Sequence, residues 1–495
     1  MTTPSSLPVA DASLRLDPMH LPAFALYGQR QEENSDAAQA QGPGWELSPT
    51  PFYLSEGQFV FLNELGPLLL SFLETLDTLY KHSVSQTPVK GVLIPKWVSD
   101  YCHFGKPEAL IQFSQMKRFR SQLPMVLRPD LLVTPEGFAL TEIDSVPGGL
   151  GFVSALNQAY RNSGFEVLDG HLELGKTLPE AFLTALKAQV PELESPVIAI
   201  VVSDEAKDYL AEWQWLIDGL QKLYPNIHCV HPRQLDLVKD KLVAELNSGQ
   251  DIQIDLLYRF FELFDLPNIP KVDLVEYALK KRILQGTPPF KPYLEEKMMM
   301  AFLHHPALAD FWEAHLGGAS FIKLKSLMPP SWLVDPSPLP PSAVIAGLEP
   351  MGRPVQSFAS MGELSQKGRQ LVLKPSGFSP LAWGSRGVTV GHDVPSEVWR
   401  EKIAEALSEF EKTPYVLQSY QNPATQELRR MELKTGEDVV FKAKTRLCPY
   451  YFVKSDASGK LKTYLSGVLA TACPADKKII HGMRDAVLAP CSVRS

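Results

Sequence analysis

The stretch from residue 128 to residue 151, RPDLLVTPEGFALTEIDSVPGGLG, constrains the fold more than any other. Two apolar runs, RPDLLV and FALTEID, flank a turn of hairpin length that contains Gly137, so we predict a β-hairpin. Side chains two apart on a strand share a face, so Glu142 and Asp144 point the same way, and Asp130 lies opposite them. Three like charges on one face repel unless a cation neutralises them, and Mg²⁺ prefers oxygen ligands. The hairpin therefore predicts a metal site, and a solvated acidic hairpin is the alternative.

The composition is that of an enzyme-sized globular protein and argues against several other classes. The chain has 495 residues, which is long for a single hydrophobic core, so we expect two or three subdomains. It is 45% hydrophobic and 21% charged, as soluble globular proteins are. The net charge of -8 argues against a general nucleic-acid-binding protein. Its five cysteines are scattered without a CxxC pair, so neither a disulfide framework nor a zinc site is predicted.

The beginning of the chain carries no targeting or membrane signal. Residues 1–17 lack the apolar core of a signal peptide, and no run approaches the about 18 apolar residues that a membrane span needs. Residues 1–50 are polar and rich in Pro, Ala and Gln, so we expect a mobile lead-in. These observations predict a cytoplasmic protein that binds neither membranes nor nucleic acids. The formation of a homodimer is left open.

Helices are predicted on both sides of the hairpin. Residues 59–80 carry apolar side chains at helical spacing, and Pro67 marks the start of this helix or a kink in it. Residues 105–122 are a second candidate and residues 152–160 a third. The third helix follows the glycine-rich segment 147–151, so its first amide groups can receive an anion. A simple glycine turn explains the same segment equally well.

The pattern changes at residue 196 to strand, helix, strand. An apolar strand at 196–204, an amphipathic helix at 206–225 and a strand at 227–232 are typical of a parallel βαβ unit, with 254–266 as a companion strand. This switch predicts a separate subdomain.

Arg259 stands in an aromatic run, YRFFE, of the companion strand. A guanidinium group in such surroundings needs an anionic partner. The sequence favours two candidate partners equally: Glu262, in a structural ion pair, and the carboxylate of a substrate.

A glycine-rich loop follows a strand at residues 370–391, QLVLKPSGFSPLAWGSRGVTVG. Small residues let backbone amides approach phosphates, and Lys374 at the end of the strand adds a positive charge. The loop is not a Walker A loop, because the order GxxxxGK[ST] is absent. A buried strand at 415–420 follows, with Gln418 suited to the edge of an adenine, and Arg446 lies on the next strand pattern.

These motifs together resemble the ATP-grasp superfamily. The likeness rests on the hairpin with Asp130, Glu142 and Asp144, on Lys374, and on the glycine-rich flap after it. The hairpin precedes the lysines, whereas it comes last in most members. The chain therefore resembles the circularly permuted branch typified by eukaryotic glutathione synthetase and glutathionylspermidine synthetase-like proteins. The likeness covers roughly residues 125–490 and consists of short motifs.

The resemblance implies roles for individual residues. It implies a Mg²⁺ site at Glu142 and Asp144, with Asp130 as a further ligand or neighbour. It implies that ATP is contacted by Lys297 and Lys374, that Gly377, Gly384 and Gly387 cover its phosphates, and that Gln418 and Tyr420 lie beside its adenine. It implies catalytic roles for Lys374 and Arg446. It implies that the substrate is contacted by Arg128, Arg259, Gly148 and Gly149.

Two features depart from the family pattern. Asp144 replaces the usual Asn, and the flap has no acidic residue where glutathione synthetases supply a metal ligand. Metal binding is then weaker or uses Asp130 instead. Lys297 also has a packing interpretation, because a lysine beside three methionines on a helix can extend from a packed face into solvent.

The resemblance implies an ATP-dependent carboxylate–amine ligase that uses ATP and Mg²⁺. A small-molecule carboxylate would form an acylphosphate, and an amine would then displace phosphate. No protein nucleophile is needed, which agrees with the lack of a nucleophile-elbow motif. A phosphotransferase and a non-catalytic nucleotide-binding protein, favoured by the missing flap carboxylate, are the alternatives.

The implied fold is α/β (α+β): a circularly permuted ATP-grasp-like fold with an inserted Rossmann-like βαβ subdomain. Its predicted parts are the lead-in at 1–50, the first part of the core with the hairpin at 51–195, the substrate subdomain at 196–275, and the nucleotide-binding part with the flap at 276–495.

Overall fold

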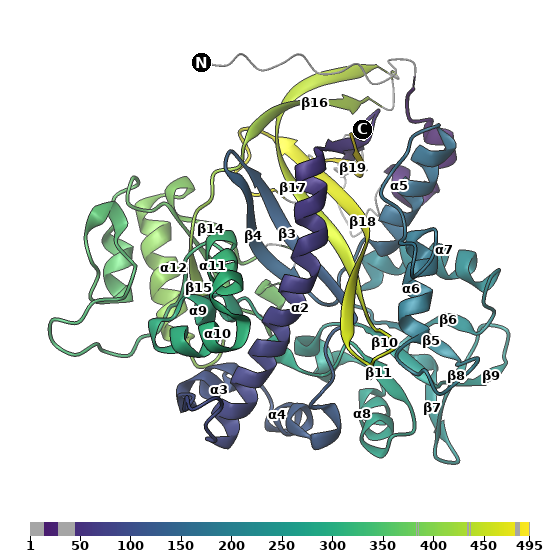
Figure 1. Ribbon diagram of the computed structural model, residues 1–495, viewed down its shortest axis with the longest axis horizontal. Coiled ribbons are helices and arrows are strands. Elements are labelled where there is room, and N and C mark those ends of the chain that lie inside the picture. The colour runs from purple at the N-terminus through teal and green to yellow at the C-terminus, as the bar shows by residue number, and fades with distance from the viewer. Residues whose placement is uncertain are drawn as a thin grey trace, which may run out of the picture.

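A computed structural model describes residues 14–27, 45–382, 384, 386–432, 435, 437–480 and 486–494. Within these residues, four sheets and the helices around them build a mixed α/β fold (Figure 1). The helices are α1 (Ala23–Tyr27), α2 (Glu56–Ser85), α3 (Lys96–His103), α4 (Glu108–Gln115), α5 (Leu150–Asn162), α6 (Leu178–Lys187), α7 (Leu210–Gln221), α8 (Val272–Lys281), α9 (Met298–His304), α10 (Ala309–Leu316), α11 (Gly318–Leu327) and α12 (Ser396–Ser408).

The largest sheet joins the beginning, the hairpin and the end of the chain. Its order is β16-β1-β19-β18-β17-β3-β4, with β2 paired to β19. The strands are β1 (Trp45–Leu47), β2 (Phe52–Leu54), β3 (Val126–Thr134), β4 (Gly137–Asp144), β16 (Thr425–Met431), β17 (Asp438–Ser455), β18 (Leu461–Pro474) and β19 (Ala486–Val493). The predicted hairpin, β3 and β4, is therefore continuous with a strand far along the chain, since Arg446 of β17 pairs with Leu132, 314 residues before it.

The register of the hairpin confirms the predicted pairing. Asp130 lies opposite Glu142, and Arg128 lies opposite Asp144. A bulge between Asp130 and Leu131 leaves Thr141 as an extra residue on β4. All four charged side chains therefore share one face of the sheet.

Helix α2 crosses the face of this sheet (Figure 1) and forms much of the main core. It begins with a capping box in which Ser55 and Gln58 satisfy each other's backbone amides, and it continues through Pro67 without ending. Gly66 allows the ring of Tyr451 to approach the helix closely. By length and composition α2 is the one described helix that could cross a membrane, but half of its most apolar window is buried inside the protein. A core helix passes the same test, so this is weak evidence for a membrane span.

The predicted βαβ unit is confirmed. Strands β5 (Ile198–Val202), β6 (Ile227–Val230), β10 (Leu256–Phe260) and β11 (Gln285–Thr287) form a parallel sheet in the order β11-β10-β5-β6. Helix α7 lies between β5 and β6 along the chain. A small antiparallel sheet follows, made of β7 (Leu235–Val238), β8 (Lys241–Glu245) and β9 (Asp251–Gln253). Because β11 pairs with β10, the parallel sheet extends past the predicted boundary at residue 275.

A further antiparallel sheet carries Lys374 and the base of the flap. Its order is β12-β15-β13-β14, from β12 (Ser331–Leu333), β13 (Leu371–Pro375), β14 (Thr389–Val390) and β15 (Tyr415–Ser419). Helix α9 packs against β12 and β15. In Figure 1 this sheet and its helices lie on the opposite side of the hairpin from the parallel sheet.

The prediction of a mobile lead-in is wrong for the described parts of residues 1–50. Leu16, Leu21 and Ala25 are buried in a small core with α5, and β1 pairs with β19. Their apolar side chains gain more from this burial than the polar composition of the segment suggested. Residues 1–13 and 28–44 lie outside the described residues.

Candidate functional site

A cavity of about 260 Å³ lies beside the charged face of the hairpin. The hairpin supplies Arg128, Asp130, Glu142 and Asp144 to its wall, and β17 supplies Arg446. A smaller cavity of about 80 Å³ adjoins it and shares Glu142, Asp144, Glu262, Lys297 and Ala382 with it. Six predicted charged residues therefore line this space: Arg128, Asp130, Glu142, Asp144, Lys297 and Arg446.

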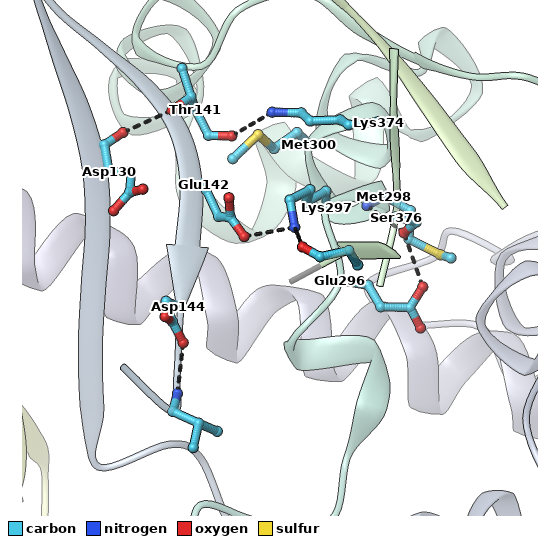
Figure 2. A network of polar contacts seen from close by, with 12 residues as sticks. Asp130, Thr141, Glu142, Asp144, Glu296, Lys297, Met298, Met300, Lys374 and Ser376 are labelled. Atoms are coloured by element: carbon cyan, nitrogen blue, oxygen red, sulfur yellow. Dashed lines mark hydrogen bonds and ion pairs between the residues drawn. The ribbon is translucent and has the colours of Figure 1, made fainter. Parts of the chain in front are cut away.

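The three hairpin carboxylates are each held by a cationic side chain. Asp130 pairs with Arg446 at 2.7 Å, and Asp144 pairs with Arg128 at 2.8 Å. Glu142 pairs with Lys297 at 2.7 Å, as Figure 2 shows.

The predicted metal site at Asp130, Glu142 and Asp144 is therefore wrong as a preformed site. Among the residues that the structure describes, no group of three His, Cys, Asp or Glu side chains is arranged to hold a metal ion. The repulsion argument was sound, but the chain supplies its own cations to neutralise the cluster. As they stand, the charge of these carboxylates is balanced by Arg446, Lys297 and Arg128, so a Mg²⁺ ion would have to displace these cations to bind here.

Burial shapes the charge of the Asp144 end of the cluster. It raises the pKa of Asp144, while the nearby Arg128 lowers that pKa by a smaller amount. Arg128 also donates to the carbonyl oxygen of Gly148 at 3.1 Å, which ties the hairpin to the loop after it. Asp130 in addition accepts from the thiol of Cys448 at 3.3 Å.

Lys297 approaches the hairpin from the beginning of α9. Its side chain is buried, and its ammonium group also reaches the carbonyl oxygen of Ala382 in the flap at 3.3 Å. Burial lowers the pKa of Lys297, but Glu142 and further carboxylates raise it more, so the net shift is upward. The interpretation of Lys297 as a lysine that extends into solvent is wrong, because Met298–Met300 face the core while Lys297 faces the cavity.

Lys374 approaches the hairpin from β13, next to Lys297. Its ammonium group donates to the carbonyl oxygen of Thr141 and to Oε1 of Gln418, both at 2.9 Å (Figure 2 shows the first bond). Burial lowers its pKa to about 8, although Glu142 acts in the opposite direction. The two lysines thus reach adjacent residues of β4, Thr141 and Glu142.

The predicted adenine contacts are not supported. Gln418 is buried, and besides accepting from Lys374 its amide donates to Ser331 at 3.0 Å and to the sulfur of Met300 at 3.4 Å. The side-chain oxygen and nitrogen of Gln418 are thus both bonded inside the protein. Gln418 therefore orients Lys374 and has no free side-chain group for an adenine base. Tyr420 lies just after β15, with its ring 4.6 Å from that of His392.

The flap is anchored at its first residues. Ser376 donates to Glu296 at 2.9 Å, and its carbonyl and hydroxyl oxygens accept from the amides of Lys297 and Met298. A side chain at Gly377 would overlap Glu296, so packing requires a glycine there. Gly384 lines the cavity with open space around it, while Gly387 packs on Pro375. Trp383 and Ser385 lie outside the described residues.

The predicted anion site before α5 is filled by the protein itself. The amides of Gly149 and Phe152 donate to the two carboxylate oxygens of Glu212, at 2.7 and 3.1 Å. Gly148 contacts Tyr209 so closely that a side chain would overlap the ring. Gly148 and Gly149 line the cavity, but the assignment of their amides to the substrate is wrong at Gly149. Sequence reasoning missed Glu212, which lies on α7, 63 residues from Gly149.

Arg259 lies behind the cavity wall and not on it. Its side chain is fully buried and pairs with Glu295, and it also donates to the carbonyl oxygen of Phe261 at 2.5 Å. The substrate role of Arg259 is therefore wrong, and the structural ion pair forms with a carboxylate other than Glu262. Glu262 instead lines both cavities.

Comparisons with known proteins support the fold but not a sequence family. No protein-family model matches the chain, and no curated protein matches it. A glutathione synthetase-like effector from Globodera pallida, solved in its apo form, matches with a TM-score of 0.54 at 10% identity, over 95% of this chain and 93% of that one. The chain has a glutathione synthetase-like fold.

This match confirms the predicted resemblance at the level of the fold, including its mixed α/β class. A putative gamma-glutamylcysteine synthetase from Methylobacillus flagellatus KT also matches, with a TM-score of 0.35 at 10% identity, over 79% of this chain and 85% of that one. A TM-score that low supports no further conclusion. At such identities, function has to be argued from the site of this glutathione synthetase-like fold.

Proposed function

We propose that the protein is an ATP-dependent ligase that joins a carboxylate to an amine and releases ADP and phosphate. The observation that carries the proposal is the meeting of Lys297 and Lys374 at adjacent residues of β4. Lys297 caps the beginning of α9 and Lys374 lies on β13, 77 residues further along the chain, and both side chains are buried beside the flap. Two buried ammonium groups fit the charge of a triphosphate.

The residues of the chain have distinct tasks in this reaction. ATP, when bound, supplies the phosphoryl group that activates the acid. Lys297 and Lys374 neutralise the charge on that group while a carboxylate oxygen of the acid forms the new bond to phosphorus and ADP leaves. Arg128 and Arg446 provide the positive charge on the cavity wall that attracts the acid. The ammonium group of the amine first loses a proton to water, and its nitrogen then forms a bond to the acyl carbon. Phosphate leaves with the electrons of the carbon–oxygen bond, and the nitrogen releases its second proton as the amide forms.

The test is the release of ADP and phosphate over a panel of acid and amine pairs. A ligase needs both co-substrates for turnover, whereas a phosphotransferase transfers phosphate to one acceptor and leaves none free. Lys374→Met should abolish the ATP-dependent signal, and Lys367→Met, outside the cavity on a turn, serves as the control. Release of phosphate without any amine would overturn the proposal.

A non-catalytic nucleotide-binding protein is the second candidate. The neutralised carboxylates favour it, because each predicted metal ligand is already paired with a cation. It predicts that ATP raises the melting temperature while no pair in the panel gives turnover.

A further inference from the structure

The carboxyl edge of the parallel sheet opens into the same cavity. Strands β5 and β10 are parallel neighbours, and their last residues, Val202 and Phe260, lie side by side in the register. Ser203 and Glu262 follow these strand ends, and both line the cavity. The crevice outside the carboxyl ends of parallel strands is where open α/β sheets bind ligands.

Glu262 differs from the other carboxylates of the cavity. Asp130, Glu142 and Asp144 are paired with cations, and Glu212 is held by backbone amides. Glu205 pairs with Arg386 at 3.6 Å, and Asp208 also has a partner. The side chain of Glu262 has no hydrogen bond and no ion pair within the described part of the chain, yet it is only partly accessible. A carboxylate removed from water in this way is costly unless a positive charge approaches it.

Ser203 provides a second, independent observation at this edge. Its side chain is 2% exposed, and its hydroxyl oxygen has no hydrogen-bond partner. A buried hydroxyl group without a partner is rare in folded proteins and points to a missing donor or acceptor. Ser203 and Glu262 together thus leave one hydroxyl group and one carboxylate unmatched on the same wall.

The adjacent wall suits an alkyl cation. Phe260 and Tyr209 pack edge to face, with ring centroids 5.6 Å apart, and both line the cavity. Aromatic rings bury aliphatic carbon and attract an ammonium group over their faces. The positive groups of the site, Arg128, Arg446 and Lys297, belong to the hairpin, to β17 and to the start of α9.

We propose that Glu262 and Ser203 form the subsite for the amine co-substrate, with Glu262 as the counter-ion of its ammonium group. This inference rests on the proposed ligase function. It assigns the arginines and lysines to the acid and phosphate and Glu262 to the amine, with Lys297 beside Glu262 in both cavities. Alkylamines enter in the ammonium form, because their pKa lies well above neutral pH.

The protonation of Glu262 should make amine binding depend on pH. Burial, and after it Glu295 of the segment before α9 and Asp144 of β4, raise its pKa to about 8 against the opposite effect of Arg259 of β10 and Lys297. A bound cation favours the ionised carboxylate, so binding releases a proton. The ionised fraction of Glu262 grows as the pH passes its pKa of about 8, so the affinity for an amine should rise through that pH and level off about one unit above it.

The experiment measures the binding of propylamine, and of propionate as the probe of opposite charge, by calorimetry without ATP. We expect Glu262→Gln to weaken the binding of propylamine at least tenfold and to remove the pH dependence of that binding. The affinity for propionate should not change. Ser203→Ala should weaken propylamine by a smaller factor. Glu245→Gln, an exposed carboxylate on β8 of the same region, should change neither.

The outcomes separate the subsite from the ligase proposal. If propylamine binding depends on Glu262 but the protein shows no turnover, the subsite is supported and the ligase proposal is overturned. Turnover whose KM for the amine is unchanged in Glu262→Gln keeps the ligase and defeats the subsite. Wild-type protein that does not bind propylamine, or that binds it with the same affinity at pH 6.5 and pH 8.5, also overturns the subsite. If Glu262→Gln unfolds, Glu262→Asp should retain part of the affinity and the pH dependence.

Discussion

Two sets of ion pairs in the protein differ in how far solvent and ligands can reach them. The wall pairs are Asp130–Arg446, Glu142–Lys297 and Asp144–Arg128. The inner pairs are Lys106–Glu296, Asp77–Lys291 and Arg259–Glu295. Glu295 lines the smaller cavity, but the side chain of Arg259 is fully buried. In each wall pair at least one side chain is 17 to 38% exposed, whereas Lys106 and Glu296 are 2% and 1% exposed.

This difference indicates which charged side chains can bind a ligand. A wall pair can exchange its partner for a ligand, because water and ligands reach it. An inner pair cannot, since breaking it leaves a charge without solvent. Charged residues alone do not mark function here, and the decisive property is access. Variants that break one pair of each set therefore test the comparison.

The largest effect is expected from an inner pair. Lys106→Met leaves Glu296 buried without its cation, since their charged groups lie 2.5 Å apart. We expect the free energy of unfolding to fall by about 3–5 kcal/mol. Urea denaturation measures it.

The double variant Lys106→Met/Glu296→Met controls for the loss of packing. It should recover a large part of the stability, because no unpaired charge remains. Equal losses in the single and double variants would show that the pair contributes by packing and not by charge.

The second effect is expected from a wall pair and concerns activity. Lys297→Met removes one of the two ammonium groups that face the transferred phosphoryl group, so turnover should fall by about 10²- to 10³-fold. Stability should change by less than about 1 kcal/mol, because the remaining Glu142 side chain is 38% exposed and can be hydrated. Steady-state kinetics and urea denaturation on the same sample provide the two values. A variant that is unstable yet fully active would place Lys297 with the inner pairs.

The third effect separates the two sets at Arg259. Arg259→Lys loses the fixed geometry of the guanidinium group between Glu295 and the carbonyl oxygen of Phe261. Stability should fall by about 1.5–3 kcal/mol, the value of a hydrogen bond to a charged group. The KM values for all substrates should stay within about twofold of the wild type. A rise in the KM for the acid alone would show that Arg259 contacts the acid substrate.

Much of the fold and part of the site could be predicted from the sequence. The hairpin followed from alternation and a glycine turn, whereas the bulge that brings Glu142 opposite Asp130 did not. The βαβ unit followed from apolar strands around an amphipathic helix. Both patterns are local, so a single sequence contains them. The convergence of Lys297 and Lys374 on the hairpin came only through the resemblance to a family.

The failed predictions share one physical cause. Gly149 was expected to bind a substrate anion, Arg259 to bind a carboxylate, and Asp130 to bind a metal. Each has instead a partner far along the chain: Glu212, Glu295 and Arg446. Local sequence shows that a charge needs a partner, but not that tertiary contacts already provide one. Glu212 carried no signal of its own, since it sits on an amphipathic helix like any surface carboxylate.

The smallest effect concerns the pH dependence of nucleotide binding through Lys374. Burial lowers the pKa of Lys374 to about 8. Below that pH the ammonium group is charged and attracts phosphate, and above it the charge is lost, so the affinity for ATP should fall as the pH rises. If bound phosphate holds the proton, the Kd should increase about tenfold between pH 7 and pH 9. Lys374→Arg remains charged over this range and should bind ATP with a constant Kd, which calorimetry at each pH can measure. A wild-type Kd as flat as that of the variant would mean that Lys374 keeps its bonds to Thr141 and Gln418 when nucleotide is present, and Lys374 would then belong with the inner pairs.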